Sequence, residues 1–155
     1  FQAFATATGG DPLASEEFTV YFAVDPRNAA PAVSGPAAAK VNKNGTLAFT
    51  GANAITVTDA ESSAGQFTAV VTATNGAVSL AGSGAADVSV TITGTLAAVN
   101  AALAGLSFTP TAGFTGAASV TVAVTDPGFL VGAENAGTGT LTIPVTVQQV
   151  VVQDR

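Results

Sequence analysis

The side chains that most often carry chemistry are scarce in this chain. It has no His and no Cys among 155 residues, and ten acidic and four basic side chains. Zinc sites, thiol catalysis and disulfide bonds are therefore excluded. A carboxylate pair, as glycosidases use, is the catalytic arrangement that remains. Sugar clefts are usually lined with aromatic rings, and the chain has no Trp and one Tyr. Asp11, Glu16 and Glu17 lie beside a predicted turn, where side chains are usually solvated. We therefore expect that the chain is not an enzyme.

The charge and the composition exclude two further classes of partner. The formal net charge is -6, and only 9% of the residues are charged, against 48% hydrophobic residues. An acidic chain without a basic stripe repels phosphate backbones, so we expect no nucleic-acid partner. No apolar run approaches the roughly 20 residues that a membrane-spanning helix needs, so we expect no membrane span.

Alternation with a period of two is the dominant pattern along the chain. Aliphatic residues alternate with Thr or Ser, so that one face of each strand is apolar and the other is hydroxylated. This pattern is typical of antiparallel sheets with one solvated face, and several such runs separated by turns predict a sandwich. The clearest runs span residues 55–58, 88–93, 119–125 and 140–147.

Local signals mark the turns and one helix. Asn44 and Asn75 each precede a Gly, which favours hairpin turns with positive φ. Pro144 within a strand pattern predicts a sheet edge or a bulge. Thr95 can cap a short helix whose inward face carries Leu96, Val99 and Leu103, and Gly105 ends it. We expect this helix to plug one end of the sandwich.

The two ends of the chain differ from its middle. Residues 1–8 and 16–24 form extended runs around a Gly-Gly-Asp-Pro turn, which predicts a hairpin followed by a Pro-bounded linker. This hairpin is either the end of a preceding repeat or an inter-subunit strand pair. The predicted division of the chain is a terminal hairpin and linker (1–30), a sandwich (31–148) and an exit strand or linker (149–155).

Two stretches carry a resemblance to a known family. They are AITVTDAESSAGQFTAVVTATNGAVSLAG, residues 54–82, and ITGTLAAVNAALAGLSFTPTAGFTGAASVTVAVTD, residues 92–126. Over about residues 31–148 the chain resembles a cadherin-like tandem repeat of large bacterial surface adhesins, and it is similar to chondroitin-sulfate-proteoglycan-type repeats. The resemblance implies an extracellular site, tandem stacking and often calcium at module junctions. With the short helix, the expected fold class is an all-β, immunoglobulin-like (cadherin-like) antiparallel β-sandwich.

The resemblance also implies a set of calcium ligands. They map onto Asp25, Asn28, Asp59, Glu61 and Asp126. Calcium takes six to eight oxygen ligands, usually including several carboxylates.

Two acidic positions of the family pattern are missing from that set. The linker Asn28-Ala29-Ala30-Pro31 lacks its Asp, and an early acidic pair falls on Lys43-Asn44. The alternative is that the remaining acids end strands and cap turns without a cofactor, and we prefer it. Lys43 would then stand where an ion would sit, because an ammonium group can neutralise clustered carboxylates.

These patterns predict a function based on shape. We expect a structural repeat module of a bacterial extracellular surface protein, an adhesin or surface-layer spacer at the cell surface. Its partners would be neighbouring repeats or identical subunits, and host-surface or matrix glycans. One alternative is a self-assembling extracellular filament joined by β-strand addition, since residues 145–152 are uncharged and strongly β-prone. The other is a carbohydrate-binding module, against which the shortage of aromatic residues counts.

Overall fold

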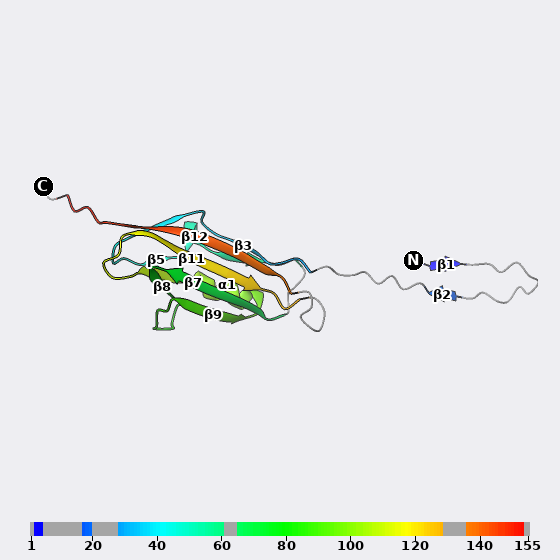
Figure 1. Ribbon diagram of the computed structural model, residues 1–155. Helices are drawn as coiled ribbons and strands as arrows, with labels where there is room; N and C mark the ends of the chain where they lie inside the picture. The colour runs from blue at the N-terminus through cyan, green and yellow to red at the C-terminus, as the bar shows by residue number, and fades with distance from the viewer. Residues whose placement is uncertain (1, 5–16, 20–27, 61–64, 129–135, 154–155) are drawn as a thin grey trace, which may run out of the picture.

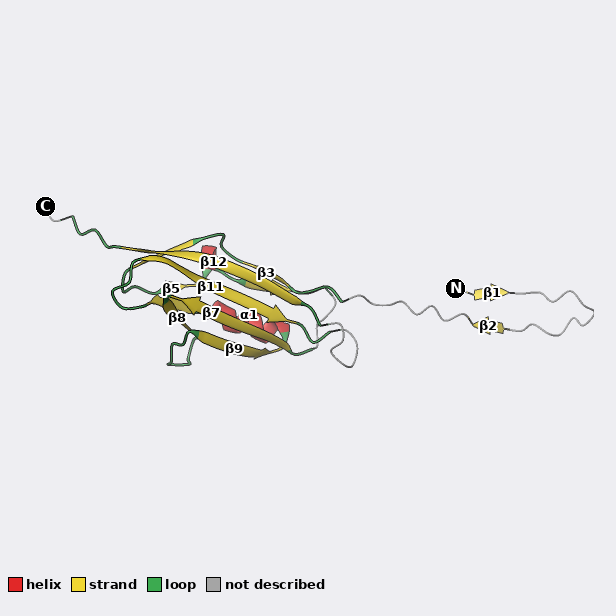
Figure 2. Ribbon diagram, in the orientation of Figure 1, coloured by secondary structure: helices red, strands yellow, loops and turns green. Residues whose placement is uncertain are grey.

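The described part of the protein is mostly β-structure with one α-helix (Figures 1 and 2). The computed structural model describes residues 2–4, 17–19, 28–60, 65–128 and 136–153. The described residues between 28 and 148 form a body of two layers around one apolar core. The all-β class predicted from the alternating runs is therefore confirmed.

The larger layer is a five-stranded sheet in the order β4-β12-β11-β7-β9. Neighbouring strands are antiparallel, except that β4 runs parallel to β12. Three of its strands coincide with the alternating runs found in the sequence. The strands are β4 (Ala39–Asn42), β7 (Phe67–Thr74), β9 (Ser89–Gly94), β11 (Gly116–Thr125) and β12 (Thr138–Gln148).

The second layer is built from shorter strands. In one half of the body β3 pairs with β6, and in the other half β5 and β8 flank β10. β5 and β6 belong to one segment that is interrupted by a short 3-10 helix, η1 (Gly51–Asn53). The strands are β3 (Ala32–Ser34), β5 (Leu47–Ala48), β6 (Thr56–Thr58), β8 (Gly76–Ser79) and β10 (Ser107–Pro110).

Alternate residues of both layers point into the core. On β11, Ala118, Val120, Val122 and Val124 are buried, whereas the residues between them are partly exposed. Burial of apolar surface of this kind is the main favourable contribution to folding. The largest buried side chains are the rings of Phe49, Phe67 and Phe108.

The helix α1 (Leu96–Ala104) forms where its capping signals predict it. Oγ1 of Thr95 accepts a hydrogen bond from the N–H of Ala98 at 3.3 Å, and Val99 and Leu103 are buried. Gly105 follows as the C-cap residue. No helix among the described residues is long and apolar enough to cross a bilayer.

The prediction that α1 plugs an end of the body is wrong. α1 lies within the second layer beside β6, on the side of β6 that faces away from β3. Oδ1 of Asn100 accepts from the N–H of Val57 at 2.8 Å, and its Nδ2 donates to the carbonyl oxygen of Val57 at 2.9 Å. The amide thereby replaces a neighbouring strand, so α1 takes the place beside β6 that β10 takes beside β5.

Both asparagine turns have the predicted positive φ, but the prediction that they close hairpins is wrong, because each turn joins a strand of the larger sheet to a strand of the second layer. Asn44 has φ 60° and Asn75 has φ 54°, so Asn adopts the left-handed conformation at each turn. Gly76 is needed for another reason, because a Cβ at this position would overlap the ring of Phe108.

The predicted N-terminal hairpin pairs as expected. β1 (Gln2–Phe4) is antiparallel to β2 (Glu17–Thr19), with Gln2 opposite Thr19. The predicted turn at residues 9–12 lies outside the described residues.

The chain enters and leaves the body at opposite ends of β12. A Cβ built on Gly137, just before β12, would lie 2.9 Å from Cβ of Ala30, so the incoming chain passes here. At the other end Gln148 pairs with Asn42, and the chain continues away from the body (Figure 1). We call these the entry end and the exit end. The 11 residues of β12 separate them by about 35 Å, at roughly 3.3 Å per residue.

Candidate functional site

The entry end is organised around the buried carboxylate of Asp126, which is 2% exposed. Its Oδ2 accepts hydrogen bonds from Nδ2 of Asn28 at 2.8 Å and from the N–H of Gly137 at 3.1 Å. Its Oδ1 accepts from the N–H of Gly128 at 2.7 Å. Donors from three segments thus meet at one carboxylate, which satisfies the requirement that a buried charge be hydrogen-bonded. We call this arrangement the entry clamp.

Glycines allow the entry clamp to form. Gly128 has φ 76°, and its N–H turns back to the Asp126 side chain two residues earlier, as in an Asx turn. A Cβ on Gly139 would overlap the carbonyl oxygen of Pro31, so only glycine lets the incoming chain lie this close to β12. The clamp therefore fastens the linker to the end of β11 and the beginning of β12.

Three of the five predicted calcium ligands lie together at the entry end. Asn28 and Asp126 are hydrogen-bonded to each other, and Asp59 directly follows β6, whose Thr58 pairs with Ala32. Asp25 and Glu61 lie outside the described residues. Within the described ranges, no group of three or more Asp, Glu, His or Cys side chains could hold a metal ion. The calcium site stays a prediction.

The hypothesis that Lys43 replaces an ion beside these acids is wrong. The N–H of Lys43 donates to the carbonyl oxygen of Gln148 at 2.7 Å, so Lys43 lies at the exit end. The acids lie at the entry end, about the length of β12 away. The error comes from the parallel pairing of β4 with the last residues of β12, which local sequence patterns do not reveal.

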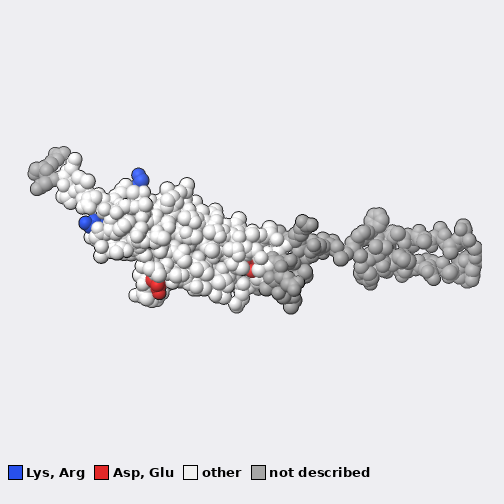
Figure 3. Space-filling view, viewed as in Figure 1, with Lys and Arg blue, Asp and Glu red and all other residues white. Residues whose placement is uncertain are grey.

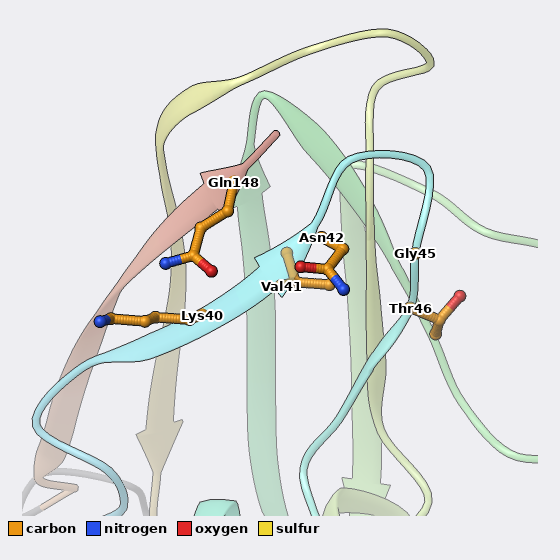
Figure 4. A pocket seen from close by; sticks show the side chains of 6 residues that line it. All are labelled: Lys40, Val41, Asn42, Gly45, Thr46 and Gln148. Atoms are coloured by element: carbon orange, nitrogen blue, oxygen red, sulfur yellow. The ribbon is translucent and has the colours of Figure 1, made fainter. Parts of the chain in front are cut away.

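The exit end contains an open hollow of about 260 Å³ between β4, the following turn and the end of β12 (Figure 4). Its lining offers amides, a hydroxyl and one ammonium group, and none of the lining residues is acidic or aromatic. Such a set can hydrogen-bond to a neighbouring chain but offers no pair of groups for acid-base or nucleophilic catalysis. The lining residues are Lys40, Val41, Asn42, Gly45, Thr46 and Gln148.

The outer face of the larger sheet carries Thr and Ser hydroxyls. Few charged residues are visible on the described surface in Figure 3. β7, β9, β11 and β12 contain no charged residue. Hydroxyls on neighbouring strands pair directly, with oxygen–oxygen distances of 3.1 Å for Thr121 and Thr142 and 2.9 Å for Thr125 and Thr138. These pairs bridge adjacent strands without charge, so the face can pack against another surface without desolvating an ion.

The bond between Asn100 and the β6 backbone was not predicted from the sequence. Leu96, Val99, Asn100 and Leu103 follow helical spacing, so Asn100 falls within the inward stripe of α1. A polar side chain in such a stripe needs a buried partner, and this signal could have identified it.

A comparison of the chain with known protein families, curated proteins and solved structures finds no match. The resemblance to cadherin-like repeats therefore stays a prediction.

Proposed function

We propose that the chain is a load-bearing spacer module of a bacterial extracellular surface protein, with an immunoglobulin-like sandwich as its fold. The observation that carries this proposal is that the chain enters and leaves at opposite ends of β12. A module with this geometry extends a tandem array by its full length. A module with both termini at one end would add little length.

The strand order supports the immunoglobulin-like assignment. In that fold one sheet has the order A-B-E-D, and the other contains C, F and G. The segments β3, β5–β6, β10 and β8 follow the first order, and β7, β11 and β12 follow the second. β9 and α1 are then additions between the fourth and fifth strands. β4 belongs to the first strand, which crosses from β6 in one layer to β12 in the other.

The pairing of β4 with β12 supports a mechanical role. Along the sequence β4 follows soon after the chain enters the body, but it lies beside the last residues of β12 and is parallel to them over four residue pairs. Tension between the ends of the body pulls these strands in opposite directions along their axes. All their hydrogen bonds then resist together, instead of breaking one after another.

Length measurements on fused copies test the spacer role. Proteins containing one, two and three full chains in series should increase in maximum dimension by equal steps in small-angle X-ray scattering. A triple fusion in which Asp126→Ala is introduced into every copy serves as a control for the entry clamp, and it should show a broader distribution of lengths. Copies that fold back on one another, with no stepwise increase in length, would contradict the proposal.

A second candidate function is a filament subunit that donates its exit strand to a neighbour. It is favoured by the exposed apolar segment after β12, where Val151 is 79% and Val152 is 81% exposed. Extended β-prone segments of this kind bind the open edges of other sheets. In this case assembly of the chain should increase with concentration and be lost on Val151→Lys. Assembly that survives this substitution would exclude the exit strand as the donor.

A further inference from the structure

β9 forms one edge of the larger sheet, and its outer side is open. It pairs with β7, and no other described strand pairs with it. The N–H of Ala73 on β7 donates to the carbonyl oxygen of Val88 at 2.8 Å. In an antiparallel ladder, successive residues alternately direct their backbone groups toward and away from the partner strand. Ser89, Thr91 and Thr93 therefore direct their N–H and C=O groups away from β7.

Asp87, two residues before Ser89, follows the same alternation and also directs its backbone groups away from β7. Asp87 exchanges two backbone hydrogen bonds with Val78 of β8, at 2.8 and 2.9 Å. β8 thus covers the outer side of the chain at Asp87, and this pairing is an isolated bridge that does not continue along β9. The outward-directed groups that follow form a short row beside which the described chain places no strand.

The two edges of the larger sheet differ in how they are protected. The β4 edge carries Lys40, and Lys43 follows it; lysines on an edge strand discourage pairing with other chains. The β9 edge has neither charge nor proline between residues 88 and 94. An exposed apolar side chain lies just before β9, since Val88 is 61% exposed. By these criteria β9 is the edge that can accept another strand.

β9 is complementary to itself in one antiparallel register. If Thr91 lies opposite Thr91 of a second copy, then Ser89 lies opposite Thr93 of that copy, and all outward-directed backbone groups meet one another. Hydroxyls then face hydroxyls, as they do between Thr125 and Thr138. On the other face apolar residues 90 and 92 meet each other, and Val88 falls opposite Gly94, which has no side chain to obstruct it.

We propose that β9 pairs with β9 of a second copy of this chain, about a two-fold axis at Thr91. An isologous contact of this kind uses the same surface on both partners and closes as a dimer. It joins two larger sheets edge to edge and would link neighbouring arrays sideways. This β9–β9 contact does not require end-to-end stacking of modules, and it is distinct from donation of the exit strand.

Single cysteine variants of the full chain test the two-fold axis, because the chain has no Cys of its own. Thr91→Cys brings two thiols to the axis with Cα atoms about 5.5 Å apart, within the reach of a disulfide. Thr93→Cys is the matched control, because its two thiols would lie about 14 Å apart. Under mild oxidation we expect about tenfold more disulfide-linked dimer from Thr91→Cys than from Thr93→Cys. A mixture of Ser89→Cys and Thr93→Cys chains should form mixed dimers.

Proline variants separate loss of pairing from loss of fold. Thr91→Pro removes an N–H that points away from β7, so the circular dichroism spectrum should persist while the dimer detected by sedimentation disappears. Val151→Lys should leave the dimer intact. Equal cross-linking of Thr91→Cys and Thr93→Cys would overturn the proposal, as would a wild-type chain that stays a 15.0 kDa monomer at every concentration. A dimer lost in Val151→Lys but kept in Thr91→Pro would overturn it in favour of the exit strand.

Discussion

The two ends of the body hold the chain by different means. At the entry end, a buried carboxylate collects three hydrogen bonds from separate segments, including one from Asn28 in the linker. At the exit end, β12 is held by a parallel strand, and neutral turn residues fasten the loops. Asn44 accepts from the N–H of Gly113 at 2.8 Å, and Asn75 donates to the carbonyl oxygen of Ala117 at 2.9 Å.

This difference has consequences for how each end tolerates change. A single charged group at the entry end satisfies several donors, so its removal leaves all of them without an acceptor at once. The exit end spreads its fastening over several weaker bonds and close packing. We therefore expect the stability of the entry end to depend on one residue, Asp126, and that of the exit end to depend on close packing.

The largest expected effect is that of Asp126→Ala. Three donors lose their buried acceptor, and we expect the free energy of unfolding to fall by about 3 kcal/mol. Urea denaturation measures this change, and Asp126→Asn is the matched control because it keeps the shape but loses the charge and one acceptor. If Asp126→Ala unfolds at the same urea concentration as the wild type, the entry clamp does not stabilise the body.

The next largest effect should come from packing at the exit end. Gly76→Ala introduces a methyl group where the Phe108 ring already lies, and we expect a loss of about 2 kcal/mol. Thermal unfolding measures this loss. Gly113→Ala is a control in open space, although its φ of 78° adds some strain of its own. A Gly76→Ala loss no larger than that of Gly113→Ala would show that close packing is unimportant here.

A smaller effect is expected from the linker. Asn28→Ala removes one of the three donors to Asp126 and should lower stability by about 1 kcal/mol. Lys40→Ala, an exposed residue at the exit end, should change it by less than about 0.5 kcal/mol. If urea denaturation shows that both substitutions lower the free energy of unfolding equally, the entry end is no more sensitive to single substitutions than the exit end.

The smallest expected effect is that of calcium. Asp126 is already hydrogen-bonded to three donors, so adding calcium after chelation should leave the melting temperature unchanged. Differential scanning calorimetry measures this. A large, saturable rise would instead support the ligand set implied by the family resemblance, because binding to the folded state alone raises stability.

Local features of the fold could be predicted from the sequence because they depend on neighbouring residues. The Thr95 cap, the positive φ of Asn44 and Asn75 and the alternating strands each arise within a few residues. The sequence also indicated that Asp126 belongs to the candidate site.

The rest depended on pairing across long stretches of chain. Asn28 and Asp126 are 98 residues apart in the sequence, and no local pattern connects them. The predicted position of Lys43 was wrong for the same reason, because its true position follows from the parallel pairing of β4 with β12. The role of Asn100 could not be recognised without the fold, because it depends on β6 having a described partner strand, β3, on one side only. The amide binds the backbone on the other side.

Single-molecule pulling tests the spacer function most directly. Because the chain has no Cys, handles attached through Ala29→Cys and Gln148→Cys would load the body along its length and shear β4 against β12. Handles attached through Ala117→Cys and Gln148→Cys would instead peel β11 from β12 at one end. We predict an unfolding force several times higher for the first pair than for the second. Equal forces in the two directions would contradict a module built to carry load between its ends.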